Sequence, residues 1–169
     1  MSRKNALLTL GFGVVSAIIF FPFAPACTSE TVVEGTHKTL YESGKLKAEI
    51  SYKGDVAEGS AREYYKNGKL KAEANYLKGK LHGVYEGYDE QGRLIDYAQY
   101  KNGLLHGRTK AYYDNGQLKS VITYRNGNKH GTQTIYHPSG KVAARVTYQN
   151  NKITKEMYYD QNGKFLQKS

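Results

Sequence analysis

Apolar and polar residues alternate along several stretches of the chain. In residues 70–76 the apolar set is Leu70, Ala72, Ala74 and Tyr76, and the residues between them are Lys71, Glu73 and Asn75. The same alternation recurs at 46–52 and at 142–148. A period of two predicts a half-buried antiparallel strand with one set on each face, because a helix would need apolar residues three and four apart.

The strands belong to a repeat with a period of 24 residues. The turn glycines follow this period, and so does a row of tyrosines at the end of each alternating stretch. Such a period predicts one supersecondary unit per repeat. The two series are Gly44, Gly68, Gly92, Gly116 and Gly140, with Gly163 one residue early, and Tyr52, Tyr76, Tyr100, Tyr124 and Tyr148.

Tight turns separate the strands. Asn67-Gly68, Asn102-Gly103, Asn115-Gly116 and Asn126-Gly127 are hairpin signals, because both residues tolerate a positive φ. Each repeat is then two antiparallel strands and two turns. The sequence predicts an all-β fold, in which about eleven strands form one elongated, twisted, single-layer antiparallel meander sheet. It predicts no helix beyond the apolar N-terminal segment.

Residues 1–26 lie outside the repeats and look like a targeting segment. Arg3 and Lys4 precede an uncharged run from Ala6 to Phe23, and small residues then lead to Cys27, the single cysteine. Ala24-Pro25-Ala26-Cys27 resembles the lipobox of bacterial lipoproteins, which implies a signal peptide at 1–26 and a lipid on Cys27. An uncleaved membrane anchor is the alternative. Either interpretation places the protein in the bacterial cell envelope, held to a membrane and facing outside the cytoplasm.

The rest of the chain divides into two parts. Residues 27–37 are polar and unpatterned and are interpreted as a tether, and residues 38–169 form the repeat domain. All 16 tyrosines lie after residue 40. The row Tyr52, Tyr76, Tyr100, Tyr124 and Tyr148 is either the packing core of a sheet without a second layer or an aromatic surface for a glycan or protein partner.

The charge is strongly basic. The chain carries +10, and removal of residues 1–26 takes away Arg3 and Lys4 and leaves +8. Basic residues also follow the turn glycines and would form a stripe along one side of the sheet. Such a stripe either attracts polyanions or keeps an open sheet soluble. The stripe consists of Lys45, Lys69, Arg93, Lys141 and Lys164.

No motif indicates catalysis, a metal or a cofactor. His82, His106 and His130 recur every 24 residues, which places them about 10 Å apart on successive repeats, too far to share one metal. They are interpreted as turn chemistry. The sequence lacks a Gly-x-Ser-x-Gly element, a phosphate loop and a His-Glu-x-x-His motif. We therefore expect a protein that is not an enzyme.

The repeat resembles the MORN-repeat variant, and specifically the bacterial YwqK-type proteins. The residues that carry the resemblance are YYKNGKLKAEANYLKGKLHG from Tyr64, YKNGLLHGRTKAYYDNGQLK from Tyr100 and YRNGNKHG from Tyr124. Members are often described as antitoxin components, so the resemblance implies an antitoxin-like role. In the last repeat Asn151 and Lys155 stand where glycines are expected, which is typical of a terminal cap.

Three functions remain open at this point. The first is a non-catalytic envelope lipoprotein that binds a protein or a cell-envelope polymer through its extended surface. The second is an antitoxin-like or immunity lipoprotein that neutralises a toxin. The third is an envelope enzyme, which would need a cleft. Nucleic acid is not expected as a partner outside the cytoplasm.

Overall fold

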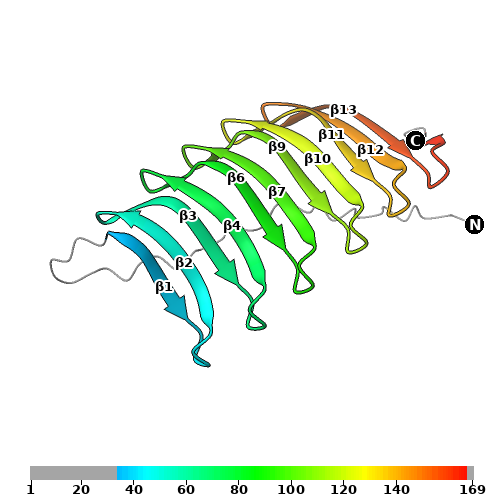
Figure 1. Cartoon of the computed structure of the whole chain (residues 1–169). Helices are drawn as coiled ribbons and strands as arrows, with labels where there is room; N and C mark the ends of the chain where they lie inside the picture. Colours follow the sequence, from blue (N-terminus) through cyan, green and yellow to red (C-terminus); the bar gives the residue numbers. More distant parts are fainter. Residues whose placement is uncertain (1–33, 167–169) are drawn as a thin grey trace, which may run out of the picture.

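The structure is a computed structural model that describes residues 34–166, and these residues form one open antiparallel sheet without helices. The strands follow one another as a meander, with β5 paired to β4 and β8 paired to β7 off the main path (Figure 1). They are β1 (Gly35–Leu40), β2 (Leu46–Lys53), β3 (Val56–Tyr64), β4 (Leu70–Leu77), β5 (Lys80–Leu81), β6 (Gly83–Tyr88), β7 (Leu94–Lys101), β8 (Leu104–Leu105), β9 (Gly107–Tyr112), β10 (Leu118–Arg125), β11 (Asn128–Tyr136), β12 (Val142–Gln149), β13 (Lys152–Tyr159) and β14 (Phe165–Leu166).

The predicted all-β meander is therefore confirmed. The count differs, because the sheet has 14 strands. Three of them, β5, β8 and β14, have only two residues each. His82 separates β5 from β6, and His106 separates β8 from β9. Each of the two short strands pairs only with the preceding strand, β5 with β4 and β8 with β7. The other strands have six to nine residues and correspond to the eleven that the periodicity predicted.

A β-bulge at the start of β2, β4, β7, β10 and β12 changes which face the side chains occupy. Between β3 and β4, Tyr64 pairs with Leu70 and Glu63 pairs with Ala72, so Lys71 is the extra residue. Leu70 therefore lies on the face opposite to Ala72, and the predicted apolar set of four is wrong at its first member. The bulge directs Lys71 to the side of Ala72, where its Nζ donates to Glu63 Oε1 at 2.8 Å.

The same bulge recurs in all five repeats. The extra residues are Lys47, Lys71, Ile95, Lys119 and Ala143. Because a bulge is a property of the pairing between two strands, alternation within one strand did not reveal it.

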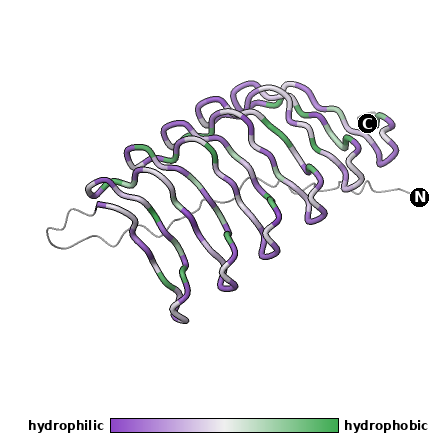
Figure 2. The backbone as a smooth tube through the Cα atoms, in the orientation of Figure 1, coloured by the Kyte–Doolittle hydropathy of each residue, from purple (hydrophilic) through white to green (hydrophobic). Residues whose placement is uncertain are grey.

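We call one side of the sheet the alanine face, because buried alanines line it. Ala61, Ala74, Ala98 and Ala144 have no exposed surface. Because the alanine side chains are small, the large rings on the same face can fold over them. The rings therefore shield this face from solvent, although the sheet has no second layer. Figure 2 shows apolar segments within the strands and hydrophilic turns at both sides of the sheet. Two clusters form the core, one from Ile50 to Ala98 and one from Ile122 to Tyr148.

Two kinds of turn alternate along the chain. In Asn102-Gly103 and Asn126-Gly127 both residues have positive φ, as the sequence predicted. Asn67 differs, because only Gly68 of that pair has a positive φ. The Asn67 side chain instead accepts a hydrogen bond from Lys69 N and donates one to Glu90 O in the next repeat. The same dipeptide therefore serves two turn geometries.

The N-terminal boundary of the sheet is β1, which begins at Gly35 and so includes three residues assigned to the tether. The predictions for the signal peptide at 1–26 and for Cys27 lie outside the described residues. No helix within residues 34–166 is long and apolar enough to cross a membrane.

Candidate functional site: two faces and a row of turns

The predicted tyrosine row lies on the alanine face and packs into both core clusters. Tyr124 and Tyr148 are buried, and Tyr52, Tyr76 and Tyr100 are partly buried. Burial raises the pKa of Tyr76, Tyr100, Tyr124 and Tyr148. The tyrosines alternate with residues of the facing strands, because Tyr76 pairs with Leu81 and Tyr100 with Leu105. The row is therefore a continuous packing ladder with part of three rings open to solvent.

One tyrosine that sequence reasoning missed is buried deeper than most of this row. Tyr85 is 5% exposed and its ring meets that of Tyr100 edge to face, with centroids 6.5 Å apart. Its hydroxyl would lie only 2.7 Å from a Cβ at Gly87. A side chain at position 87 would clash with the Tyr85 ring, and this clash explains the glycine. The available signal was that Gly87 falls outside the periodic glycine series.

Asp96 is a second residue that sequence reasoning missed. It occupies the strand position that holds Ala48, Ala72 and Ala144 in other repeats, on the same face as Tyr85. Burial raises the pKa of the Asp96 carboxyl, and the positive charge of Lys119 partly opposes the rise. The same cross-strand row holds Glu63 on β3 and Ser120 on β10, and Lys71 binds the Glu63 carboxylate at 2.8 Å.

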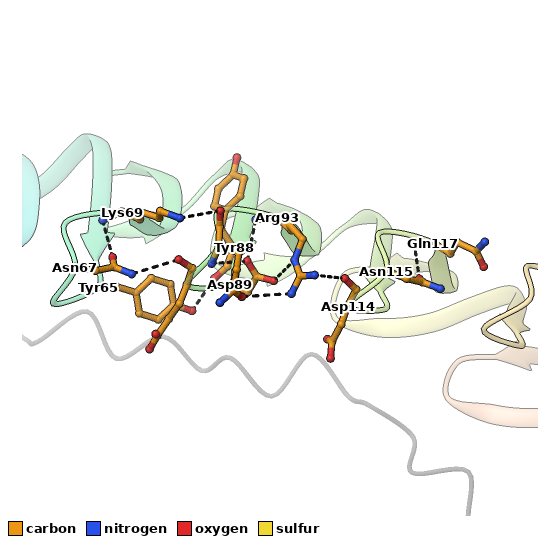
Figure 3. A network of polar contacts seen from close by, with 11 residues as sticks. Tyr65, Asn67, Lys69, Tyr88, Asp89, Arg93, Asp114, Asn115 and Gln117 are labelled. Atoms are coloured by element: carbon orange, nitrogen blue, oxygen red, sulfur yellow. Dashed lines mark hydrogen bonds and ion pairs between the residues drawn. The ribbon is translucent and has the colours of Figure 1, made fainter.

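The predicted basic stripe lies at the first row of turns, and part of it holds neighbouring repeats together. Lys45 Nζ donates to Lys66 O at 3.1 Å, and Lys69 Nζ donates to Gln91 O at 3.1 Å. Arg93 donates to Asp114 O and pairs with Asp89 (Figure 3). Each of these cations therefore reaches the turn of the next repeat.

The other two members of the stripe differ. Lys141 and Lys164 are exposed and stand at the same turn position, but the repeat between them and Arg93 carries Gln117 instead of a cation. The five residues thus do not form one continuous line of free charge. Tyrosine hydroxyls form further hydrogen bonds between neighbouring repeats. Tyr41, Tyr65 and Tyr113 donate to the carbonyls of Tyr64, Tyr88 and Tyr136 at 2.6–2.7 Å.

The opposite side of the sheet, which we call the charged face, holds one continuous cross-strand row. Ladder pairs connect each member to the next across ten strands. In order from β2 to β13 the row is Glu49, Arg62, Glu73, Glu86, Tyr97, Lys110, Val121, Thr134, Arg145 and Met157.

The first part of this row is an ionic network. Arg62 lies between two carboxylates, 2.8 Å from Glu73 and 3.6 Å from Glu49. Tyr64 donates to Glu49 at 2.7 Å, and Tyr88 donates to Glu86 at 2.6 Å. The carboxylates raise the pKa of Arg62, and burial with the hydrogen bond to Glu86 raises the pKa of Tyr88 to about 12. The later part of the row contains Lys110 and Arg145 and no carboxylate.

The periodic histidines lie near the second row of turns. His106 Nδ1 is 3.2 Å from Asn126 Oδ1, and the Nδ1 atoms of His82 and His130 are buried without a hydrogen-bond partner. Within residues 34–166, no three histidine, cysteine, aspartate or glutamate side chains come together as metal ligands.

Comparison with known families decides the affiliation. The model of the MORN repeat variant matches five successive blocks, residues 33–53, 57–78, 81–102, 105–126 and 129–150, which together span more than half of the chain. The chain belongs to the MORN repeat variant family. Each matched block covers one hairpin unit of the sheet, and MORN repeats indicate a repeat-based binding module.

Among solved structures, the similarities are weak. A mutant of S. aureus TarM in complex with fondaparinux, alpha-GlcNAc-glycerol and UDP matches 57% of this MORN-repeat chain over 19% of its own length, with 14% identity and a TM-score of 0.38. The GtfA/B complex bound to UDP and GlcNAc matches 75% of the chain over 29% of its own length, with 14% identity and a TM-score of 0.27. The chain thus spans under a third of either protein, and neither similarity enters the proposals below. No curated protein sequence matches the chain.

Proposed function

We propose that this MORN-repeat protein is a non-catalytic binding module of the bacterial cell envelope, held to a membrane through a lipid on Cys27. The observation that carries the proposal is the open sheet itself. Successive repeats present equivalent side chains about 10 Å apart along a single layer. This spacing suits a long partner, and it keeps polar side chains apart instead of clustering them as a catalytic site would. The lone cysteine after a small-residue segment supports the anchor.

The anchor can be tested by replacing the lipidation site. Cys27→Ser should leave the protein unlipidated, shift its mature size and release it from the membrane fraction, because several acyl chains are needed for firm membrane attachment. Cell fractionation with labelling by a fatty-acid analogue measures both. A variant that stays in the membrane at unchanged size would favour the uncleaved anchor.

The binding role can be tested in living cells. A photo-reactive residue placed at Thr123, exposed on the charged face, should capture the partner, whereas the same residue at Glu42 in the first row of turns should capture less. Capture of an envelope polymer or a structural protein supports the scaffold role. Capture of a toxin would support the antitoxin-like role that the YwqK-type resemblance implies. Capture at neither position, with the protein correctly anchored, would contradict both.

A further inference from the structure

The charge of the described chain is unevenly distributed. Residues 34–101 carry 12 basic and 11 acidic side chains, whereas residues 102–166 carry 10 basic and three acidic ones, Asp114, Glu156 and Asp160. Asp114 and Asp160 lie in turns, and Glu156 pairs with Val146 on the alanine face. The charged face of strands β9–β13 therefore has cations and no carboxylate of its own.

Four cations on this part of the charged face form two pairs. Arg108 and Lys110 are two residues apart on β9, and Arg145 and Lys155 lie on the neighbouring strands β12 and β13. Three strand spacings separate Lys110 from Arg145, which is about 14 Å. Arg108, Arg145 and Lys155 are exposed. In Figure 1 these strands form the yellow-green to red end of the sheet.

Threonines fill the space between the two pairs. Thr123 pairs with Arg108, Thr134 pairs with Arg145, and Thr147 pairs with both Thr132 and Lys155. The Oγ1 atoms of Thr132 and Thr147 are 3.1 Å apart. We call these eight residues the cation surface: Arg108, Lys110, Thr123, Thr132, Thr134, Arg145, Thr147 and Lys155.

Two of the cations are held in place without being neutralised. Lys110 Nζ lies 5.3 Å from the centre of the Tyr97 ring, and Arg145 Cζ lies 5.9 Å from that of Tyr159. A ring orients the cation through its quadrupole and leaves the full charge available to a ligand. In the first half of the same row, carboxylates occupy the equivalent neighbours of Arg62.

The composition of the surface argues against a protein partner. Protein interfaces depend on buried aromatic or aliphatic anchors. Phe165 borders the cation surface through its ring contact with Tyr159, and none of the eight residues of this surface is among the large exposed apolar side chains of the described residues. They are Leu40, Val56, Leu77, Val84, Leu104, Ile153, Phe165 and Leu166. Hydroxyls and point charges on a flat sheet instead suit a polar, hydroxyl-rich chain.

We propose that the cation surface binds a phosphodiester-linked polyol or sugar polymer that lies across strands β9–β13. Arginine guanidinium groups bind phosphate oxygens bidentately, and lysine ammonium groups and threonine hydroxyls donate to phosphate oxygens from single points. The polymer's phosphates lie over the two cation pairs, and its hydroxyls face the threonines. This inference rests on the proposed envelope binding role and gives it a site and a ligand class.

The test compares two variants of the full-length chain in neutral detergent that lose the same charge. One carries Arg108→Gln, Lys110→Gln, Arg145→Gln and Lys155→Gln. The matched control carries Lys45→Gln, Lys69→Gln, Lys141→Gln and Lys164→Gln, from the turn stripe. The probe is poly(glycerol phosphate), and binding is measured by calorimetry at about 50 mM and about 500 mM salt. Circular dichroism verifies that both variants retain the sheet.

The wild type should bind at low salt and lose most binding at high salt. The first variant should bind at least about tenfold more weakly, and the stripe variant should stay within about threefold of the wild type. Thr134→Glu, which places one negative charge between Lys110 and Arg145, should weaken binding strongly, whereas Ser60→Glu on β3 should not. Equal loss in the two Gln variants would overturn the proposal, because net charge alone would then explain it.

Two further probes decide the ligand class. Equal binding of polygalacturonate would overturn the assignment to phosphate, and binding of vesicles of phosphatidylglycerol and phosphatidylcholine without binding of the polymer would identify a membrane surface instead. Failure to bind any probe, while the photo-reactive residue at Thr123 captures a protein in cells, would overturn this inference and leave the proposed function standing.

Discussion

The two halves of the charged face share one backbone and differ in chemistry. From β2 to β6 the row Glu49, Arg62, Glu73 and Glu86 carries three carboxylates and one cation, and the carboxylates accept ion pairs from Arg62 or hydrogen bonds from tyrosine hydroxyls. From β9 to β12 the same row carries Lys110 and Arg145 with Val121 and Thr134 between them. The comparison teaches that a repeat determines the geometry of a surface position and leaves its chemistry free, so an acidic row and a basic row stand side by side on one sheet.

The largest expected effect tests whether the halves share one backbone. Gly68→Val and Gly140→Val each place a β-branched residue at a φ near +85°, since these glycines have φ of +87° and +83°. Each should cost about 1–3 kcal/mol of unfolding free energy. A Cβ at Gly68 would meet no atom within 4 Å, and a Cβ at Gly140 would meet only Gln117 Oε1 at 3.7 Å, an ordinary contact, so backbone strain causes the loss. Urea denaturation of both variants measures it.

The control for this experiment is Thr123→Val, on an exposed strand position that favours β-branched residues, with an expected change of about 0.5 kcal/mol or less. A clear difference between the two glycine variants would break the comparison, because the two halves would then not use the same turn.

The next effect concerns Asp96, at the boundary between the halves. Asp96→Ala restores the alanine that three of the other repeats carry at this position and should stabilise the protein by roughly 0.5–2 kcal/mol at neutral pH. Because burial raises the pKa of Asp96 above its ordinary 3.8, the folded chain binds this proton more tightly than the unfolded chain. The penalty therefore develops as the pH rises above 3.8, and the gain from the substitution should vanish below it.

Thermal unfolding of the wild type and Asp96→Ala between about pH 3 and pH 8 measures this gain. Ser120→Ala, at the same position on β10 but without a titrating group, is the matched control and should show no such pH dependence. A gain for Asp96→Ala that is independent of pH would mean that packing, and not the buried charge, decides the stability.

The smallest effect tests the charges themselves. Arg62→Met removes the cation between Glu49 and Glu73 and leaves these two carboxylates without it. We expect a loss of about 1 kcal/mol of unfolding free energy, because the Arg62 side chain is exposed and exposed ion pairs are weaker than buried ones. Arg145→Met removes a cation that no carboxylate of its row balances, and should change stability by about 0.3 kcal/mol or less. Urea denaturation at low and high salt compares them, and equal costs would contradict the proposed difference between the halves.

The sequence was sufficient for the architecture and insufficient for the surfaces. Periodic glycines and alternation predicted the meander and its turns, because these depend on local backbone preference and on the two-residue period of a strand, and they left open whether the tyrosine row is a core or a binding surface. The resemblance to the MORN-repeat variant was confirmed by the match to five repeats, whereas the YwqK-type assignment stays a prediction. The lipid on Cys27 and the envelope location stay predictions.

What only the tertiary structure decided is which residues meet across strands. The bulge at Lys71 reverses the face of Leu70, and Arg93 reaches the next repeat, although neither fact is visible within one strand. The cation surface likewise assembles Lys110 and Arg145, which are 35 positions apart in the sequence. Cross-strand neighbours are set by register, and register is the sum of every bulge and turn between the strands. A local pattern therefore predicts the strands, whereas only the folded sheet determines the surface that they form.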